Sequence, residues 1–156
     1  MKQSAGILLY NIVNLKPEFF LVHPGGPFFA KKNEGCWTIP KGEFLDNEFP
    51  LNAAMREFEE ETGYKPTGPF IELQPIIQKA GKKVYCWAAL GELDAEGIMS
   101  NTFEMVWPPK SGNLKSFPEV DKAGWFNYDA AKVLINERQI DLLDQLIAIV
   151  KEKRPV

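Results

Sequence analysis

The strongest helical pattern in the sequence is the stretch Pro50–Thr62, which reads PLNAAMREFEEET. Its apolar residues recur at intervals of three and four positions, at Leu51, Ala54, Met55 and Phe58. This spacing predicts a helix with one face directed towards a core. Pro50 suits the first turn of such a helix, and Gly63 suits the left-handed residue that follows its last turn.

The same helix carries a second, acidic pattern at Glu57, Glu60 and Glu61. Residues at these intervals share one face, which we expect to lie apart from the apolar stripe. Like charges so arranged destabilise a helix by a few tenths of a kcal/mol, and anions near its C-terminus also oppose the helix dipole. One interpretation is a solvated glutamate-rich surface. The other is a site for a hard cation, Mg²⁺ or Mn²⁺, which binds carboxylate oxygens.

The residues that flank the helix favour the cation site. Gly42 is followed after five residues by Glu48, and after seven more by the run REFEEETGY at residues 56–64. The segment resembles the motif of the Nudix hydrolases, G-x5-E-x7-R-E-U-x-E-E-x-G-U, in which U is a bulky apolar residue. All seven fixed positions match, while Phe58 and Tyr64 are aromatic where aliphatic residues are more usual.

The resemblance implies a set of site residues. Nudix enzymes hydrolyse a nucleoside diphosphate linked to another group, with divalent metals bound at the motif helix. By position, Glu57, Glu60 and Glu61 match the metal ligands, and the carbonyl of Gly42 is a further ligand. Arg56 matches the arginine that orients a glutamate of this set, and Glu48 matches a residue that forms a structural salt bridge.

Further candidates lie outside the motif. In this family the base that accepts a proton from water is either a motif glutamate, here Glu57 or Glu60, or a glutamate on a later loop, for which Glu119 is the candidate. Lys41 is a candidate phosphate contact, and His23 and Trp107 are candidate substrate contacts. For each residue the alternative is structural: a solvated loop acid, a surface lysine, or a side chain that packs in a turn. Glu43, next to Gly42, is a weaker candidate for a metal contact.

The remaining chain predicts an α+β fold with a mixed sheet and helices packed on it. Expected strands cover residues 4–13 and 18–23 around a turn at Lys16-Pro17, then residues 36–39, 70–79, 83–90 and 124–127. Asp129 is expected to cap a short helix that ends at Leu134, and a last helix is expected over residues 139–151. Residues 91–118, which contain the run WPPKSG from Trp107, are expected to be irregular. This order resembles the Nudix α/β/α sandwich, with the motif helix and a C-terminal helix.

Composition bounds the protein class. The chain has 156 residues, of which 45% are hydrophobic and 25% charged, as expected for one globular domain over residues 1–156. The net charge of −3 argues against a broad basic surface for duplex nucleic acid. No apolar stretch reaches the roughly 20 residues of a membrane-spanning helix. The two cysteines cannot form a disulfide framework, so a cytoplasmic protein with reduced thiols is expected.

Together these features predict a Mg²⁺-dependent hydrolase, with Mn²⁺ as a substitute, that acts on a nucleotide substrate. The runs HPGGP from His23, WTIPKGE from Trp37 and WPPKSG from Trp107 resemble small bacterial Nudix proteins that act on nucleoside triphosphates or dinucleoside polyphosphates. The alternative is a non-catalytic Nudix fold that binds nucleotides as a regulatory module, and a third option is an RNA 5′-end pyrophosphohydrolase. A monomer or a homodimer is expected.

Overall fold

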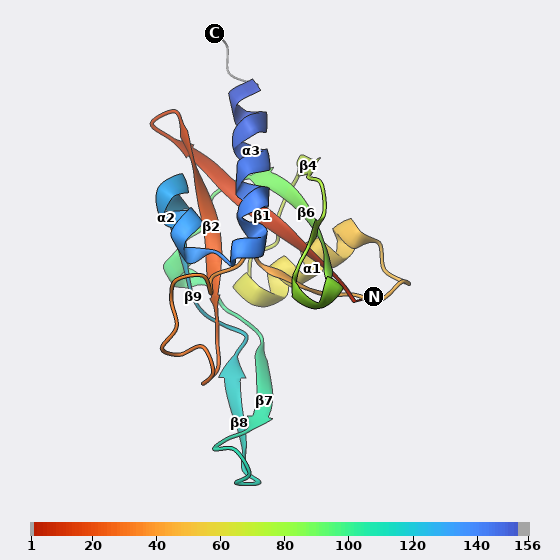
Figure 1. The fold of residues 1–156 in the computed structure, drawn as a ribbon, viewed down its shortest axis with the longest axis vertical. Helices are drawn as coiled ribbons and strands as arrows, with labels where there is room; N and C mark the ends of the chain where they lie inside the picture. Colours follow the sequence, from red (N-terminus) through yellow and green to blue (C-terminus); the bar gives the residue numbers. More distant parts are fainter. Residues whose placement is uncertain (1, 153–156) are drawn as a thin grey trace.

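In the computed structural model, which describes residues 2–152, a mixed sheet lies between two layers of helices (Figure 1). Met1 and residues 153–156 of the predicted domain lie outside the described residues. The strands are β1 Gln3–Val13, β2 Lys16–Pro24, β3 Lys41–Glu43, β4 Phe70–Glu72, β5 Ile76–Ile77, β6 Lys83–Leu90, β7 Thr102–Val106, β8 Leu114–Pro118 and β9 Val120–Asn127. The helices are α1 Pro50–Thr62, α2 Tyr128–Leu134 and α3 Ile140–Glu152, with 3₁₀ turns at Lys79–Gly81, Ala95–Gly97 and Glu137–Gln139.

Side-chain alternation along β1 produces the layers. Ile7 and Leu9 join the core beneath α1, whereas Leu8 and Tyr10 join the core beneath α2 and α3. The main path of the sheet runs β4-β6-β1-β2-β9, with β6 parallel to β1 and the other pairs antiparallel. The predicted α+β fold with a mixed sheet, a motif helix and a C-terminal helix is therefore confirmed. Among the described helices, none has the length and apolar character needed to cross a membrane.

The forked pairing of β1 positions the candidate site. Its first residues pair with β3, Ala5 opposite Gly42, and its last residues pair with β2, Tyr10 opposite Phe19. Residues 25–40 pass out of the sheet between these two pairings, and the chain returns as β3 beside α1. The helix that carries the acidic residues is thus packed against the strand that contains Gly42.

Two expected elements in the first third of the chain are wrong in position. The turn lies at Asn14 and Leu15, which have positive φ angles of 52° and 67°, as the tight turns that match strand twist require. Lys16 already pairs with Val13, so it belongs to β2. The strand expected at residues 36–39 consists of isolated bridges at Trp37 and Thr38, and the regular strand comes later as β3.

The segment 91–118 is not wholly irregular. It contains β7 and β8, which pair in register from Thr102 opposite Pro118 to Val106 opposite Leu114. The proline run forms the connection between them, where no ladder hydrogen bonds are needed. Figure 1 shows this pair, here called the arm, extending away from the main sheet at the end opposite α3.

The prediction that Asp129 caps α2 is also wrong. The side chain of Asn127, rather than that of Asp129, accepts a hydrogen bond from a main-chain amide of the first turn, that of Ala130, at 2.9 Å. Asp129 instead lies inside the first turn of the helix, where its charge acts only through the helix dipole.

Asn127→Ala is expected to lower the free energy of unfolding by about 1 kcal/mol, because it removes this cap. Chemical denaturation measures the change. Asp129→Ala is the matched control, and it should cost less than half as much. An equal or larger loss for Asp129→Ala would contradict the assignment of the cap.

Candidate active site

The inner face of α1 carries carboxylates as well as apolar side chains. Glu57 and Glu61 are each only 9% exposed, and they lie on the same side of the helix as the buried residues Ala54 and Phe58. The expectation that the acidic face lies apart from the apolar stripe is therefore wrong for these two residues. The first half of α1 covers the apolar core, while its second half brings carboxylates to the edge of the sheet.

The main chain of β3 lies directly against these carboxylates. A Cβ atom on Gly42 would lie 2.1 Å from the carboxyl carbon of Glu57, so a side chain at this position would displace the Glu57 carboxylate. The backbone N–H of Lys41 lies close enough to Glu61 to lower the pKa of its carboxyl group. Such a close approach is what a metal contact by the Gly42 carbonyl would require.

Arg56 links the acidic residues to one another. Its Nε and Nη2 donate to the two carboxylate oxygens of Glu48 at 2.8 and 2.9 Å, a bidentate pair. Its Nη1 donates to Glu57 at 2.9 Å and to both oxygens of Glu60 at 3.3 Å. The salt bridge expected for Glu48 is present. Arg56 is thus anchored on one side and orients Glu57 and Glu60 on the other.

Glu119 reaches the same site from a distant part of the sequence. Its backbone N–H donates to the carbonyl of Asn101 at 2.8 Å, and the backbone N–H of Asn101 donates to the carbonyl of Glu60 at 2.7 Å. The carbonyl of Glu119 accepts from Gly25 at 2.9 Å. Asn101, which the sequence analysis did not single out, therefore connects the helix to the loop. No periodicity or motif marks it, because it acts through its main chain.

The positive charges of Arg56 and Lys41 only partly compensate the carboxylates of the site. Burial raises the pKa of Glu57, and repulsion by Glu60 raises it further. Burial raises the pKa of Glu61 well above its ordinary value, with repulsion by Glu57 and Glu119 added. Burial and the charge of Glu60 likewise raise the pKa of Glu119. Such a set of oxygen donors suits a hard divalent cation, which would relieve both effects.

The fit to a cation rests on the chemistry of the oxygen donors, because a preformed coordination site is not present among the described residues. Within residues 2–152, no three His, Cys, Asp or Glu side chains are already arranged around one point as metal ligands. Arg56 instead holds Glu57 and Glu60. The residue types, their burial and the approach of Gly42 fit Mg²⁺ or Mn²⁺.

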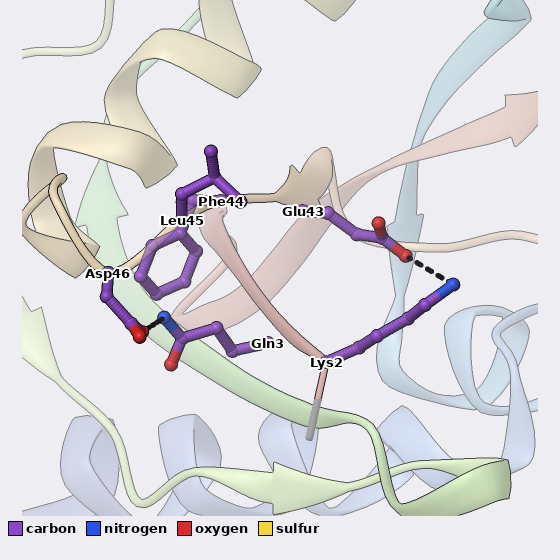
Figure 2. Close-up of a pocket in the computed structure, with 6 residues that line it drawn as sticks. All are labelled: Lys2, Gln3, Glu43, Phe44, Leu45 and Asp46. Atoms are coloured by element: carbon purple, nitrogen blue, oxygen red, sulfur yellow. Dashed lines mark hydrogen bonds and ion pairs between the residues drawn. The ribbon is translucent and has the colours of Figure 1, made fainter.

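Glu43 shows the contrasting case of an acid that has cationic partners. Its carboxylate accepts a hydrogen bond from Lys82 at 3.1 Å, which lowers its pKa. Figure 2 shows Glu43 directed towards Lys2, 4.0 Å away, beside a hollow of about 370 Å³. Glu43 is therefore engaged with lysines, and the weaker expectation of a metal contact finds no support in its geometry.

Two of the predicted substrate contacts, Lys41 and Trp107, lie in different parts of the structure. Lys41 lines a cavity of about 220 Å³, and its pKa is lowered by burial and by the charge of Lys82. Trp107 follows β7 on the arm, where it packs edge-to-face with Phe28 at 5.8 Å between ring centroids. The structure does not bring Trp107 together with the carboxylates of α1.

The expectation that His23 contacts the substrate is wrong. Its side chain is fully buried, with Nδ1 2.7 Å from Asp121 Oδ1 and Nε2 2.7 Å from the carbonyl oxygen of Lys32. Both ring nitrogens are used, so none is available to a substrate. His23 holds the loop that contains Lys32 against the start of β9, a structural role.

Comparison with known proteins gives one family. The sequence model of the NUDIX domain matches residues 2–146. An mRNA-decapping protein g5R of African swine fever virus (strain Badajoz 1971 Vero-adapted) is 29% identical over 120 residues, which cover 71% of this chain and 44% of that protein. The chain thus spans less than half the length of the curated relatives it matches.

Solved structures share the fold at low identity. A C. elegans Ap4A hydrolase in a binary complex is 21% identical, with a TM-score of 0.64, and the match covers 97% of this chain and 99% of that one. The NUDIX domain of Shewanella oneidensis NrtR, complexed with ADP ribose, is 16% identical, with a TM-score of 0.63 and coverage of 95% and 87%. These similarities support the fold.

Glu61→Gln is expected to stabilise the metal-free protein at pH 7. Because the pKa of Glu61 is higher in the folded than in the unfolded state, its contribution to stability is favourable at low pH and is lost as the pH rises above its ordinary value of 4.5. Gln keeps an oxygen for the Lys41 N–H and removes the buried charge. The gain in the free energy of unfolding should be larger at pH 7 than at pH 5, because the buried charge forms as the pH rises.

Denaturation at pH 5 and pH 7 in the presence of a chelator measures this gain. The exposed Glu59→Gln is the matched control and should change stability little at either pH. A Glu61→Gln protein less stable than the parent at pH 7 would contradict the interpretation that the carboxylate is strained by burial.

Proposed function

Because the chain belongs to the NUDIX domain family, we propose that it is a Mg²⁺-dependent hydrolase that cleaves a phosphoanhydride bond in a nucleotide substrate. A nucleoside triphosphate or a dinucleoside polyphosphate is the proposed class. The observation that carries the proposal is the convergence of Glu57, Glu60 and Glu61 of α1 with Glu119, three of them with raised pKa values. A pyrophosphate is a polyanion, so such a site can receive it only together with cations.

Glu57, Glu60, Glu61 and the carbonyl of Gly42 are the proposed ligands of the cation. When bound, Mg²⁺ or Mn²⁺ supplies the positive charge that neutralises pyrophosphate oxygens and polarises the attacking water. Arg56 keeps Glu57 and Glu60 oriented through hydrogen bonds of 2.9 and 3.3 Å, and Glu48 fixes Arg56 in turn. The roles of Glu48 and Arg56 are therefore to position the ligands.

Glu119 is the proposed general base. Burial and the charge of Glu60 raise its pKa, which brings it nearer to the working pH and makes it a better proton acceptor. Among the hydrogen bonds of the described residues, none occupies its carboxylate, whereas Glu60 is held by Arg56. Glu119 takes a proton from water, the water oxygen forms a bond to phosphorus, and the bridging oxygen leaves with the departing phosphate. Glu60 is the alternative base.

Lys41 is proposed to contact a substrate phosphate, because it is close enough to Glu61 and Glu57 for their charges to act on its pKa. Trp107 stays a prediction, since it lies on the arm. We also propose that the protein works in the cytoplasm on small nucleotides, as a monomer or a homodimer and without duplex nucleic acid. Both cysteines are free thiols, as this location requires.

Two alternative functions are each supported by one of the comparisons. The NrtR structure is a NUDIX domain complexed with ADP ribose, so a non-catalytic nucleotide-binding module is the alternative. The curated relatives are named mRNA-decapping proteins, so a capped or triphosphorylated RNA end is a further substrate class.

One screen separates these functions. Nucleoside triphosphates, dinucleoside polyphosphates, ADP-ribose and a capped RNA oligonucleotide are incubated with the protein and Mg²⁺, and the products are identified. Release of phosphate or nucleoside monophosphate from small nucleotides supports the proposal. Binding without any product would overturn it in favour of the regulatory module.

Glu60→Gln is expected to reduce turnover by at least about 100-fold with little change in thermal stability, because it removes one proposed ligand charge at a partly exposed position. Steady-state kinetics on the best substrate of the screen measure the loss. Glu59→Gln, one position away and exposed, should retain parental activity. Full activity of Glu60→Gln would rule out its assignment to the metal site.

Mg²⁺ is expected to raise the melting temperature of the parent protein, because the ion binds the folded state and relieves the repulsion among its carboxylates. Glu57→Gln should reduce this rise, whereas Glu43→Gln, whose carboxylate contacts lysines, should keep it. Differential scanning fluorimetry over a Mg²⁺ titration provides the measurement. The same response in both variants would place the ion elsewhere.

A further inference from the structure

A second polar surface lies on the other face of β3. Successive residues of a strand point to opposite faces, so Lys41 is directed away from the side on which Gly42 meets Glu57. Lys41 lines a cavity of about 220 Å³ whose other polar walls include Gln78 and Asn136, and whose apolar walls include Pro24 and Phe29. This volume is below the roughly 300–1,000 Å³ typical of whole-ligand sites, so the cavity suits one part of a ligand.

The orientation of the Gln78 amide follows from its neighbours. The backbone N–H of Ile39 can only donate, and it donates to Oε1 of Gln139 at 3.0 Å. The Nε2 of Gln139 is thereby left to donate, to Thr38 Oγ1 at 2.8 Å and to Gln78 Oε1 at 3.3 Å. Gln78 therefore accepts with its oxygen, and its NH₂ group is left as a donor.

The same reasoning applies to Asn136. Its Oδ1 accepts the backbone N–H of Arg138 at 2.9 Å, as the cap of the 3₁₀ turn Glu137–Gln139. The Nδ2 of Asn136 is thus also a donor without a partner among the hydrogen bonds of the described residues. Lys41 adds an ammonium group, which has no acceptor. Gln78, Asn136 and Lys41 therefore each contribute a free hydrogen-bond donor to the cavity wall.

We propose that this cavity binds the base of the nucleotide and selects bases that present an oxo group over bases that present an amino group. The inference rests on the proposed nucleotide hydrolase function and names its substrate class more closely. An oxo group accepts from the donors of Gln78 or Asn136. An amino group would face donors with donors and leave buried polar groups unpaired. Phe29 and Pro24 offer a flat apolar wall that suits a ring better than a second phosphate.

Matched substrate pairs test the selection. ITP and ATP differ at C6, where an oxo group replaces an amino group, and UTP and CTP differ in the same way at C4. The values of kcat/KM are expected to be about tenfold higher for ITP than for ATP and for UTP than for CTP, since one hydrogen bond is worth about 1 kcal/mol and an unpaired donor costs more. Equal values within each pair would overturn the inference.

Two isosteric variants change a donor of the cavity wall into an acceptor and keep the hydrogen bonds that hold the wall in place. Gln78→Glu retains the oxygen that accepts from Gln139, and Asn136→Asp retains the cap to Arg138. Each replaces an NH₂ donor by an acceptor, so the ITP-to-ATP ratio should fall at least about fivefold. Because both substrates carry the same charge, the ratio is insensitive to general repulsion.

Gln74→Glu is the control for the added charge. Its side chain is exposed and outside the cavity, and Gln145 contacts only its main chain. The control should leave the ITP-to-ATP ratio at the parental value, and thermal unfolding verifies that all three variants fold. A ratio unchanged in both cavity variants would also overturn the inference.

A binding measurement separates this inference from the proposed function. Calorimetric titration of the metal-free parent protein with IMP and AMP gives a Kd ratio that needs no turnover. Tighter binding of IMP with no hydrolysis of any nucleotide would support the base selection and refute the hydrolase. Hydrolysis of nucleotides without a preference between bases would support the hydrolase and refute the base selection. Inorganic pyrophosphate is titrated as a competitor of IMP. If Gln78→Glu weakens pyrophosphate binding as much as it weakens IMP binding, the cavity is a phosphate site and the inference is overturned.

Discussion

The burial of two carboxylates against the backbone of a strand is the constraint on which the rest of the site depends. Glu57 lies directly against Gly42, where no side chain separates it from β3, and Glu61 is buried beside it on the same helix face. The forked pairing of β1 brings β3 to this place, and Arg56, anchored by Glu48, holds Glu57 in it. A fold that served stability alone would replace these acids by apolar residues, because buried like charges repel and lose hydration.

This constraint places two kinds of side chain on one face of α1. Ala54 and Phe58 pack into the core beneath the helix, and Glu57 and Glu61 are buried beside Phe58 on the same face. Core packing and the acidic site thus share one helix face. Site residues that weaken the fold are a general feature of active sites, because the arrangement required for chemistry is rarely the most stable one.

Much of this arrangement could be predicted from the sequence. The bounds of α1 and its left-handed end at Gly63 followed from apolar spacing and from the placement of proline and glycine. The motif identified Glu57, Glu60 and Glu61 and the acid-paired Arg56, because their spacing along one helix is a local property.

Non-local properties could not be predicted in the same way. Helical spacing separates apolar from acidic residues, but it cannot tell that the acidic face is also turned inward. The two bonds of His23 depend on partners 98 and 9 positions away, and the place of Glu119 depends on the main chain of Asn101. The strands of the arm were hidden by a proline run that marks their connection.

The glycines at the base of the arm have a mechanical meaning. Gly25 lies against the carbonyl of Pro118, and Gly26 lies against the ring of Phe103, so the loop after β2 packs closely on the base of the arm. Glu119 is bonded to this loop through Gly25 and directly continues β8. The arm, the loop and Glu119 are therefore directly connected, so the position of the proposed general base depends on how the arm packs against the loop.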